Sequence, residues 1–274
     1  VYGGMPKEMT LDDIHEIIKC FGQAAARARE AGYDAVELHA AHGFLLHQFL
    51  SAHANRRTDE YGGDILQRAR FLIEVLREVR RQVGDDYPIS IRISVDEEIK
   101  GGYTAEDMQK VAPELVKNGC DIIHCSFGTH GSPAGIIQAP IEYQPGFNVK
   151  LARKIKEVVS VPVIGVGRFN DPFIANDCIA RGDADLIAFG RQHLADPDFL
   201  KNAVNGNFED TIKCLACNQG CIERAMFEQK SIRCAINPET GQELIYPTEP
   251  AAVRRNVWVV GGGPAGLTAA YEAA

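Results

Sequence analysis

The segment Pro88-Ile89-Ser90-Ile91-Arg92-Ile93-Ser94 is an isoleucine-rich run of the kind that forms a β-strand. Helical spacing of apolar residues precedes it over residues 65–83 and follows it over 104–118. The same alternation continues outward in both directions. We expect further strands over residues 35–39, 121–125, 161–166 and 185–189, and further helices over residues 11–31, 148–158 and 171–181.

Strands that alternate with helices form right-handed βαβ units, which predict an α/β fold with a parallel sheet. Long connections follow three of the strands, over residues 40–64, 95–103 and 126–147. Loops at the carboxyl ends of the strands build the active sites of (β/α)8 barrels. We therefore expect the last five units of a TIM barrel, and a doubly wound sheet is the competing fold.

The two ends of the sequence bear on this expectation. The chain begins at Val1 rather than at methionine, and it stops at Ala274 within an expected helix. A closed barrel would need about three more units. We expect a fragment, with a partial barrel over residues 1–205, a cysteine-containing segment over 206–250 and the start of another domain over 251–274.

Composition argues against several classes of function. The 274 residues include 29 basic and 37 acidic side chains, a formal net charge of -8, which disfavours nucleic acid as a partner. No run of 18 apolar residues predicts a membrane span, and no secretory leader is recognisable. We expect a cytoplasmic protein with reduced cysteines that acts on a small molecule, with a homo-oligomer left open.

Four cysteines form the strongest local signal, with the spacing Cys214-x2-Cys217-x3-Cys221-x12-Cys234. Four thiolates in an irregular segment suit a tetrahedral metal centre. Three close ligands followed by a fourth favour a [4Fe–4S] cluster, whereas zinc sites more often pair two C-x2-C units, so zinc is the alternative. We expect the other cysteines to be buried apolar residues: Cys20, Cys120, Cys125 and Cys178.

A glycine-rich turn follows a strand-like run over residues 256–260. Its glycines, Gly261, Gly263 and Gly266, match the G-x-G-x-x-G fingerprint at the start of an expected helix. The amino terminus of that helix would hold the pyrophosphate of a dinucleotide. The acidic residue that distinguishes the dinucleotides would lie beyond the sequence, so this turn alone does not separate FAD from NAD(P).

Three histidines follow expected strands. His39 ends one strand and His42 comes three residues later, so one short turn would bring both imidazoles over the same pocket. There they could donate hydrogen bonds to a substrate carbonyl or carboxylate. His130 lies in a glycine-containing loop and could donate a proton. The alternative for His39 and His42 is a pair satisfied by the backbone of a loop, and the alternative for His130 is a surface histidine.

Arginines mark candidate anion sites. Arg92 interrupts an apolar strand, and a buried arginine needs an anionic partner, either a ligand or a structural partner such as Glu37 or Asp121. Glycines let backbone N–H groups approach a phosphate, and arginine adds charge. A phosphate site is therefore expected after the last two strands, at Gly167, Arg168, Gly190 and Arg191.

Together these motifs resemble one family. Residues 37–46, ELHAAHGFLL, and residues 57–63, RTDEYGG, are similar to the core signature of Old Yellow Enzyme-type flavin oxidoreductases. The cysteines followed by a dinucleotide fingerprint resemble the multidomain branch, which includes 2,4-dienoyl-CoA reductase, 2-enoate reductase, the bile-acid-inducible NADH:flavin oxidoreductases and trimethylamine dehydrogenase. The resemblance covers essentially the whole chain.

The resemblance implies FMN on the barrel, a [4Fe–4S] cluster and FAD, with electrons passing from NAD(P)H through FAD and the cluster to FMN. Arg92 would then face the flavin pyrimidine edge, and the four residues after the last two strands would hold the FMN phosphate. His39 and His42 would polarise the activating group of an unsaturated substrate, whose C=C bond receives a hydride.

One position departs from the family pattern. Many members carry tyrosine two residues after the second histidine, as a proton donor, whereas this chain has Phe44. We expect His130 or a bound water to supply the proton instead. Two other functions remain open: an amine dehydrogenase that uses the same cofactors in reverse, which the cysteine spacing disfavours, and a non-catalytic iron–sulfur or zinc scaffold.

Overall fold

The computed structural model describes residues 7–133, 136–245 and 250–274. Five parallel strands form one sheet in the order of the sequence. Each strand lies within two residues of its expected range, which confirms the α/β fold with a parallel sheet. The strands are β1 (Val36–Ala40), β2 (Ile89–Ser94), β3 (Ile122–Ser126), β4 (Val163–Val166) and β5 (Leu186–Ala188).

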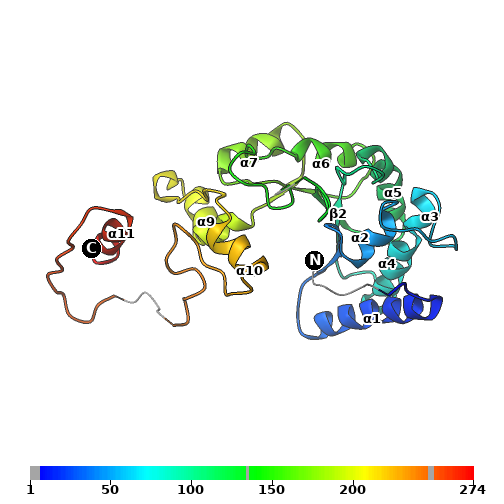
Figure 1. The fold of residues 1–274 in the computed structure, drawn as a ribbon, viewed down its shortest axis with the longest axis horizontal. Helices are drawn as coiled ribbons and strands as arrows, with labels where there is room; N and C mark the ends of the chain where they lie inside the picture. Colours follow the sequence, from blue (N-terminus) through cyan, green and yellow to red (C-terminus); the bar gives the residue numbers. More distant parts are fainter. Residues whose placement is uncertain (1–6, 134–135, 246–249) are drawn as a thin grey trace.

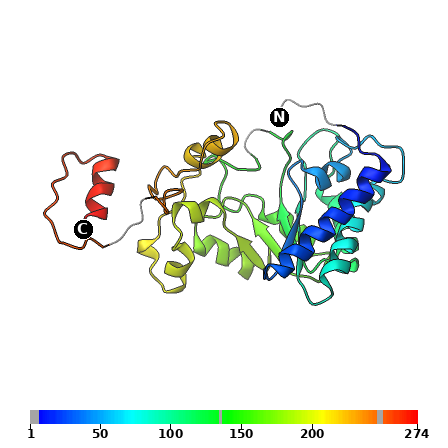
Figure 2. The same ribbon diagram turned by 90° about the horizontal axis from the view of Figure 1, so that it is seen from below.

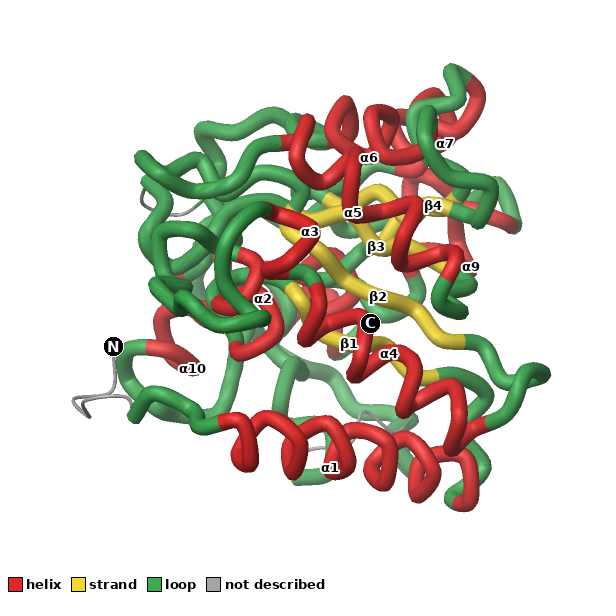
Figure 3. The backbone as a smooth tube through the Cα atoms, turned by 90° about the vertical axis from the view of Figure 1, so that its right-hand side faces the viewer, coloured by secondary structure: helices red, strands yellow, loops and turns green. Residues whose placement is uncertain are grey.

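The longer helices line the outer side of this sheet in an arc (Figure 1). They are α1 (Leu11–Glu30), α4 (Arg70–Val83), α5 (Ala105–Lys117), α6 (Val149–Lys156) and α7 (Pro172–Ala180). Thr10 caps α1 as expected, since its hydroxyl accepts from the Asp13 N–H and its own N–H donates to the Asp13 carboxylate. Figure 3 shows α1 beside α4 and the curved sheet behind them.

The helix expected over residues 65–83 is two helices, α3 (Ile65–Arg68) and α4, joined at Ala69. The buried Arg68 side chain explains the break, because it donates to the carbonyl of Leu50 at the end of α2 (Leu45–Leu50). The first turn is thereby tied to α2, while the rest of the helix packs on α1.

The two faces of the sheet differ in chemistry. Leu38, Ile91, Ile93 and Ile123 are buried against the helices and belong to the main hydrophobic core. Side chains alternate between the two faces along each strand, and the residues that alternate with these apolar ones are mostly polar. There the register sets His39 beside Arg92 and Arg92 beside His124, with Glu37 and Ser90 paired one step earlier. This polar face positions the candidate site.

Short elements follow β5. They are α8 (Arg191–Ala195), α9 (Phe199–Val204), a 3-10 turn (Phe208–Asp210), a π-helical turn (Gln219–Glu223) and α10 (Arg224–Met226). Figure 2 shows these elements beside the later strands of the sheet and helix α7. No helix within residues 7–133, 136–245 and 250–274 is long and apolar enough to cross a membrane.

The strand expected over residues 256–260 is not formed. Only the helix after the glycine turn is present, as α11 (Pro264–Glu272), and Figure 1 shows it apart from the sheet and its helices. A strand needs a neighbour to take its backbone hydrogen bonds. Residues 256–260 pair with no strand among the described residues, and Trp258 is 91% exposed.

Candidate cofactor and substrate site

A pocket opens at the carboxyl ends of strands β2 to β5. It holds about 790 Å³ of empty space, part of it open to solvent. Five residues expected at an anion site come together in its lining: Arg92, Gly167, Arg168, Gly190 and Arg191. Ser126 and Asn148 complete its polar wall.

Arg92 has no protein counter-ion among the described residues. Its Nε atom is buried without a hydrogen-bond partner. The two structural partners considered above are occupied elsewhere, since Glu37 binds His124 at 3.0 Å and Asp121 binds Arg80 at 2.5 Å. Burial lowers the pKa of the Arg92 guanidinium, and only the Glu37 charge opposes this shift. A cation left unpaired in a pocket is suited to an anionic ligand.

The second anion-binding element is the turn after β4. Gly167 has a φ of +153°, and a Cβ atom there would lie 1.8 Å from Asn148 Oδ1, so any other residue would be strained and would displace the Asn148 side chain. The next residue, Arg168, has a φ of 56° and a buried Nε without a partner. Asn148 Oδ1 is also unpaired. One donor, Arg168 Nε, and one acceptor, Asn148 Oδ1, are therefore left without a partner in residues that line the pocket.

The turn after β5 carries the other two residues expected at the phosphate, Gly190 and Arg191. The Arg191 guanidinium donates to the carbonyls of Gln138 and Ala139, and also to Asn218 Oδ1. Three of its hydrogen-bonding directions are therefore taken up by protein. Arg191 lines both this pocket and a second one formed by the cysteines. Its neighbour Gly190 lines the first pocket and leaves open space around its Cα.

His39 and His42 lie side by side, with ring centroids 5.0 Å apart. His42 is in the left-handed region (φ 60°), which turns the chain back over the strand end. Its Nε2 is 2.6 Å from the Ser126 hydroxyl. If this hydroxyl donates, Nδ1 carries the ring proton and remains free to donate to a ligand.

Both imidazoles are held neutral. Burial, followed by the charge of Arg92, lowers the pKa of His42 to about 2. The same two causes, in the same order, lower the pKa of His39. Neutral imidazoles can donate hydrogen bonds to a carbonyl, but they are poor sources of a proton in this environment.

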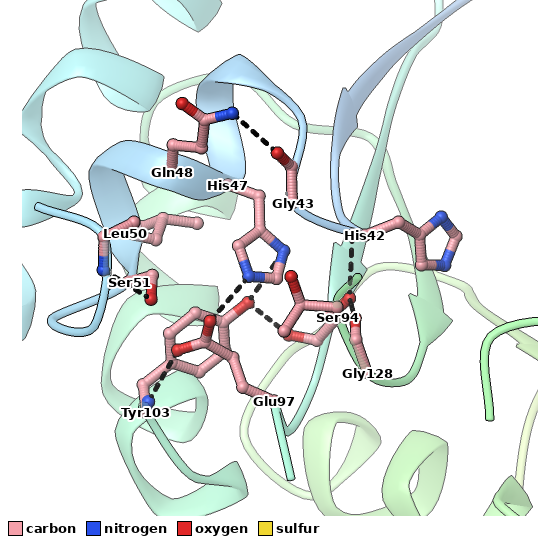
Figure 4. Close-up of polar contacts among 12 residues, drawn as sticks. His42, Gly43, His47, Gln48, Leu50, Ser51, Ser94, Glu97, Tyr103 and Gly128 are labelled. Atoms are coloured by element: carbon pink, nitrogen blue, oxygen red, sulfur yellow. Dashed lines mark hydrogen bonds and ion pairs between the residues drawn. The ribbon is translucent and has the colours of Figure 1, made fainter. Parts of the chain in front are cut away.

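A buried network fixes the loop that carries His42 (Figure 4). The Ser94 hydroxyl accepts from the His42 N–H at 3.1 Å and donates to the Gly128 carbonyl at 2.6 Å. The Tyr103 hydroxyl donates to the Ser94 carbonyl at 3.0 Å. Behind them, His47 binds Glu97 at 2.9 Å, and both side chains are 1% exposed. The loop after β1 is thus tied to the loop after β3.

Phe44 and His130 complete this end of the site. The Phe44 ring lies 5.0 Å from that of His39 and 5.4 Å from that of His130. Phe44 is half exposed and His130 is exposed. The chain therefore brings His130 to the same aromatic group as His39, while Phe44 stands between the two rings.

The four cysteines of the spaced motif line one small hollow, together with Arg191. Gly220 makes this possible, because a Cβ there would lie 2.6 Å from the Arg233 carbonyl. The Arg233 N–H donates to the Gly220 carbonyl at 2.7 Å, which carries Cys234 toward the other three cysteines. Within the described ranges no group of three or more possible ligands is arranged to hold a metal ion.

The cysteine segment is anchored to residues that follow β4 and β5. Buried Gln192 accepts from the Cys214 N–H at 2.9 Å, and Asn170 donates to the Cys214 carbonyl at the same distance. Cys214 also lines the first pocket. Of the other cysteines, Cys120, Cys125 and Cys178 are buried as expected, but Cys20 is exposed on α1.

The glycine turn before α11 keeps part of its expected geometry. Gly261 has a φ of +108°, and a Cβ on Gly266 would lie 2.0 Å from the Gly261 carbonyl oxygen. Gly263 caps the helix. Close packing of the turn against the helix therefore depends on glycine, although the preceding strand is absent.

Sequence reasoning missed several residues of the site. Ser94, Ser126 and Asn148 are small polar residues whose side chains look unremarkable in the sequence, and only the fold places them beside His42 and Gly167. A polar residue at every second position of β2 and β3 was the available signal, because it marks the inner face of the sheet.

The fold and the pocket define a class of protein, the parallel β/α proteins that bind a ligand at the carboxyl ends of their strands. Within this class the chain belongs to the NADH:flavin oxidoreductase / NADH oxidase family, whose profile matches residues 2–209.

Two curated relatives extend this result to nearly the full chain. An NADH oxidase from Thermoanaerobacter brockii is 44% identical over 273 residues, which are 99% of this chain and 42% of the relative. A cinnamate reductase from Clostridium sporogenes is 36% identical over 283 residues, which are 98% of this chain and 42% of the relative. The chain thus spans well under half the length of these relatives.

Two solved structures are similar. A 2-naphthoyl-CoA reductase in complex with 2-naphthoyl-CoA has a TM-score of 0.92 at 36% identity, covering 97% of this chain and 40% of that chain. A histamine dehydrogenase from Rhizobium sp. 4-9 has a TM-score of 0.80 at 33% identity, covering 88% of this chain and 35% of that chain.

Proposed function

We propose that this chain acts in a flavin-dependent ene reductase that reduces an activated C=C bond, such as that of a 2-enoate or an enoyl-CoA, with electrons from NAD(P)H. The carrying observation is the unpaired Arg92 beside the neutral pair His39 and His42. Such an arrangement suits an anionic ring system next to a site for a carbonyl group.

FMN fits the residues of the pocket. The partnerless atoms Arg92 Nε, Arg168 Nε and Asn148 Oδ1 offer hydrogen bonds to a ligand with an anionic edge, hydroxyl groups and a phosphate. Arg92 would hold the flavin ring, and Gly167 with Arg168 would hold the phosphate. Bound FMN supplies hydride chemistry at this place.

The residues of the chain would divide the remaining tasks. His39 and His42, both neutral, would donate hydrogen bonds to the substrate carbonyl and withdraw electron density from the C=C bond. Ser126 would hold the His42 ring in one tautomer. His130, or a water beside it, would supply the proton, because Phe44 has none to give.

Two further cofactors belong to the proposal. The shared hollow of Cys214, Cys217, Cys221 and Cys234 supports a [4Fe–4S] cluster, since four thiols and a nearby Arg191 suit its negative charge. The glycine turn at Gly261, Gly263 and Gly266 supports FAD binding. The proposal assigns FMN and substrate to residues 1–205, the cluster to residues 206–250, and the start of a dinucleotide-binding domain to residues 251–274.

The test uses the full-length protein, purified without oxygen and reduced with NADH. Addition of a 2-enoate or enoyl-CoA ester should reoxidise the flavin rapidly, which absorbance will show. The relative that is a histamine dehydrogenase makes amine oxidation the second candidate. No reoxidation by any alkene, with flavin reduction by an amine instead, would establish that candidate.

The proton donor is tested separately. A His130→Gln protein should still bind FMN and take up electrons from NADH, but should reoxidise more slowly with the alkene. Full alkene reduction by this variant would exclude His130 and leave water as the donor.

A further inference from the structure

The inner face of the sheet carries a second polar group, one step below Arg92 along the strands. Glu37, on β1, accepts from the Ser90 hydroxyl at 2.9 Å. The same carboxylate binds His124 Nδ1, with its two oxygens at 3.0 and 3.3 Å. An ionised carboxylate only accepts hydrogen bonds, so Nδ1 of His124 carries the proton that is donated.

Glu37 is the anion whose charge acts on Arg92. Burial lowers the pKa of the Arg92 guanidinium, and the Glu37 charge opposes this shift. Arg92 pairs with His39 across the strands and Glu37 lies two residues earlier on β1, so both side chains project from the same face. Strands lie about 4.8 Å apart and same-face residues about 6.6 Å apart, a separation that the long arginine side chain can span.

The two groups nevertheless form no ion pair within the described part of the chain, and Arg92 Nε remains unpaired. The Glu37 side chain is 38% exposed, so tight packing does not hold it away. The hydrogen bonds from Ser90 and His124 hold it instead. Burial alone would raise the pKa of Glu37, but these two partners and the Arg92 charge lower it, so the carboxylate stays ionised.

We infer that His124 acts as a positioning residue that holds the Glu37 carboxylate away from Arg92, so that the arginine charge stays available to a bound flavin. The inference rests on the proposed function for its consequence. A positive charge near the flavin N1–C2=O edge stabilises the reduced, anionic ring and thereby raises the flavin reduction potential. If Glu37 swung to Arg92, that charge would be compensated within the protein.

Four variants of the full-length protein test the inference. His124→Leu removes the donor, and His124→Asn retains an N–H near the position of Nδ1. Glu37→Gln removes the anion, and the double variant Glu37→Gln/His124→Leu removes both. The first readout is the midpoint potential of the FMN. The second is the dissociation constant for sulfite, which adds to N5 of the FMN and leaves a negative charge at N1–C2=O.

We expect His124→Leu to shift the ratio of reduced to oxidised flavin about tenfold, a fall of about 30 mV for a two-electron couple, and to weaken sulfite binding by a similar factor. His124→Asn should stay within about twofold of the wild type. The double variant should recover at least the wild-type values, because no carboxylate remains to pair with Arg92. A double variant that falls as far as His124→Leu would overturn the inference.

A flavin-free readout separates this inference from the proposed function. In a crystal structure of the His124→Leu protein, Glu37 should lie within ion-pair distance of Arg92. Glu37 still bound to Ser90, with Arg92 unpaired, would overturn the positioning role even if FMN binds. A wild-type protein that fails to bind FMN would contradict the proposed function but leave this structural test intact.

Discussion

At the scale of single residues, the unpaired state of Arg92 carries most of the functional argument. The sequence predicts that a cation within the strand needs an anion, but it leaves both a ligand and a structural ion pair open. In the structure, Glu37 and Asp121 are bound by other residues, which supports a ligand as the partner. The pairing could not be predicted, since it depends on cross-strand register.

Arg92→Met should weaken FMN binding by about tenfold to a hundredfold, since a hydrogen bond to a charged group contributes about 1.5–3 kcal/mol. The measurement is titration of flavin-depleted protein with FMN, followed by fluorescence quenching. Arg153→Met is the matched control, because Arg153 is 58% exposed on α6, and it should bind as the wild type does. Equal affinity for FMN in both variants would contradict the assignment.

The burial of His42 predicts a pH dependence of stability. Its folded pKa of about 2 lies below the ordinary value of 6.5, so the unfolded chain binds a proton that the folded chain does not. Above pH 6.5 His42 is neutral in both states, so the free energy of unfolding does not depend on its titration. Below pH 6.5 only the unfolded chain takes up the proton, so the free energy of unfolding decreases as the pH falls. Each pH unit below 6.5 corresponds to about 1.4 kcal/mol.

Urea unfolding of wild type and His42→Asn at pH 6.5 and 5.0 measures this effect. Between these values the wild type should lose up to about 2 kcal/mol more than the variant. Parallel losses in the two proteins would show that His42 becomes protonated without cost in the folded state.

At the scale of elements, the strands were predicted well because short apolar runs between helical patterns have few alternatives. The helix inside the long loop over residues 40–64 was missed. The six-residue helix α2 places His47 and Leu50 in the core, but its sequence offers no clear periodicity to distinguish it from the surrounding loop. The paired histidines were predicted to meet, whereas the serines that hold them depend on tertiary contacts.

The network that joins the two loops predicts unequal losses of stability. Tyr103→Phe removes one hydrogen bond to the Ser94 carbonyl and should lower the free energy of unfolding by about 0.5–1.5 kcal/mol. Glu97→Leu leaves buried His47 without its carboxylate and should cost about 3 kcal/mol or more. Denaturant unfolding of the two variants measures both values, and equal losses would contradict the account of the network.

At the scale of the whole molecule, the sheet, the cysteine segment and the glycine turn show how far local patterns reach. The cysteine spacing predicts a shared site, and Gly220 explains how Cys234 reaches it. The strand over residues 256–260 was wrongly predicted because local propensity cannot supply the neighbouring strand that it needs. Arg191 lines both pockets, so the two candidate redox sites share a wall that no local pattern in the sequence predicts.

The most direct measurement is the cofactor content of the full-length protein purified without oxygen. Extracted flavins, iron and acid-labile sulfide are quantified per chain. The account predicts about one FMN, about one FAD and about four atoms each of iron and sulfide. Protein that contains zinc in place of iron and retains no FMN, even after incubation with FMN in excess, would contradict it.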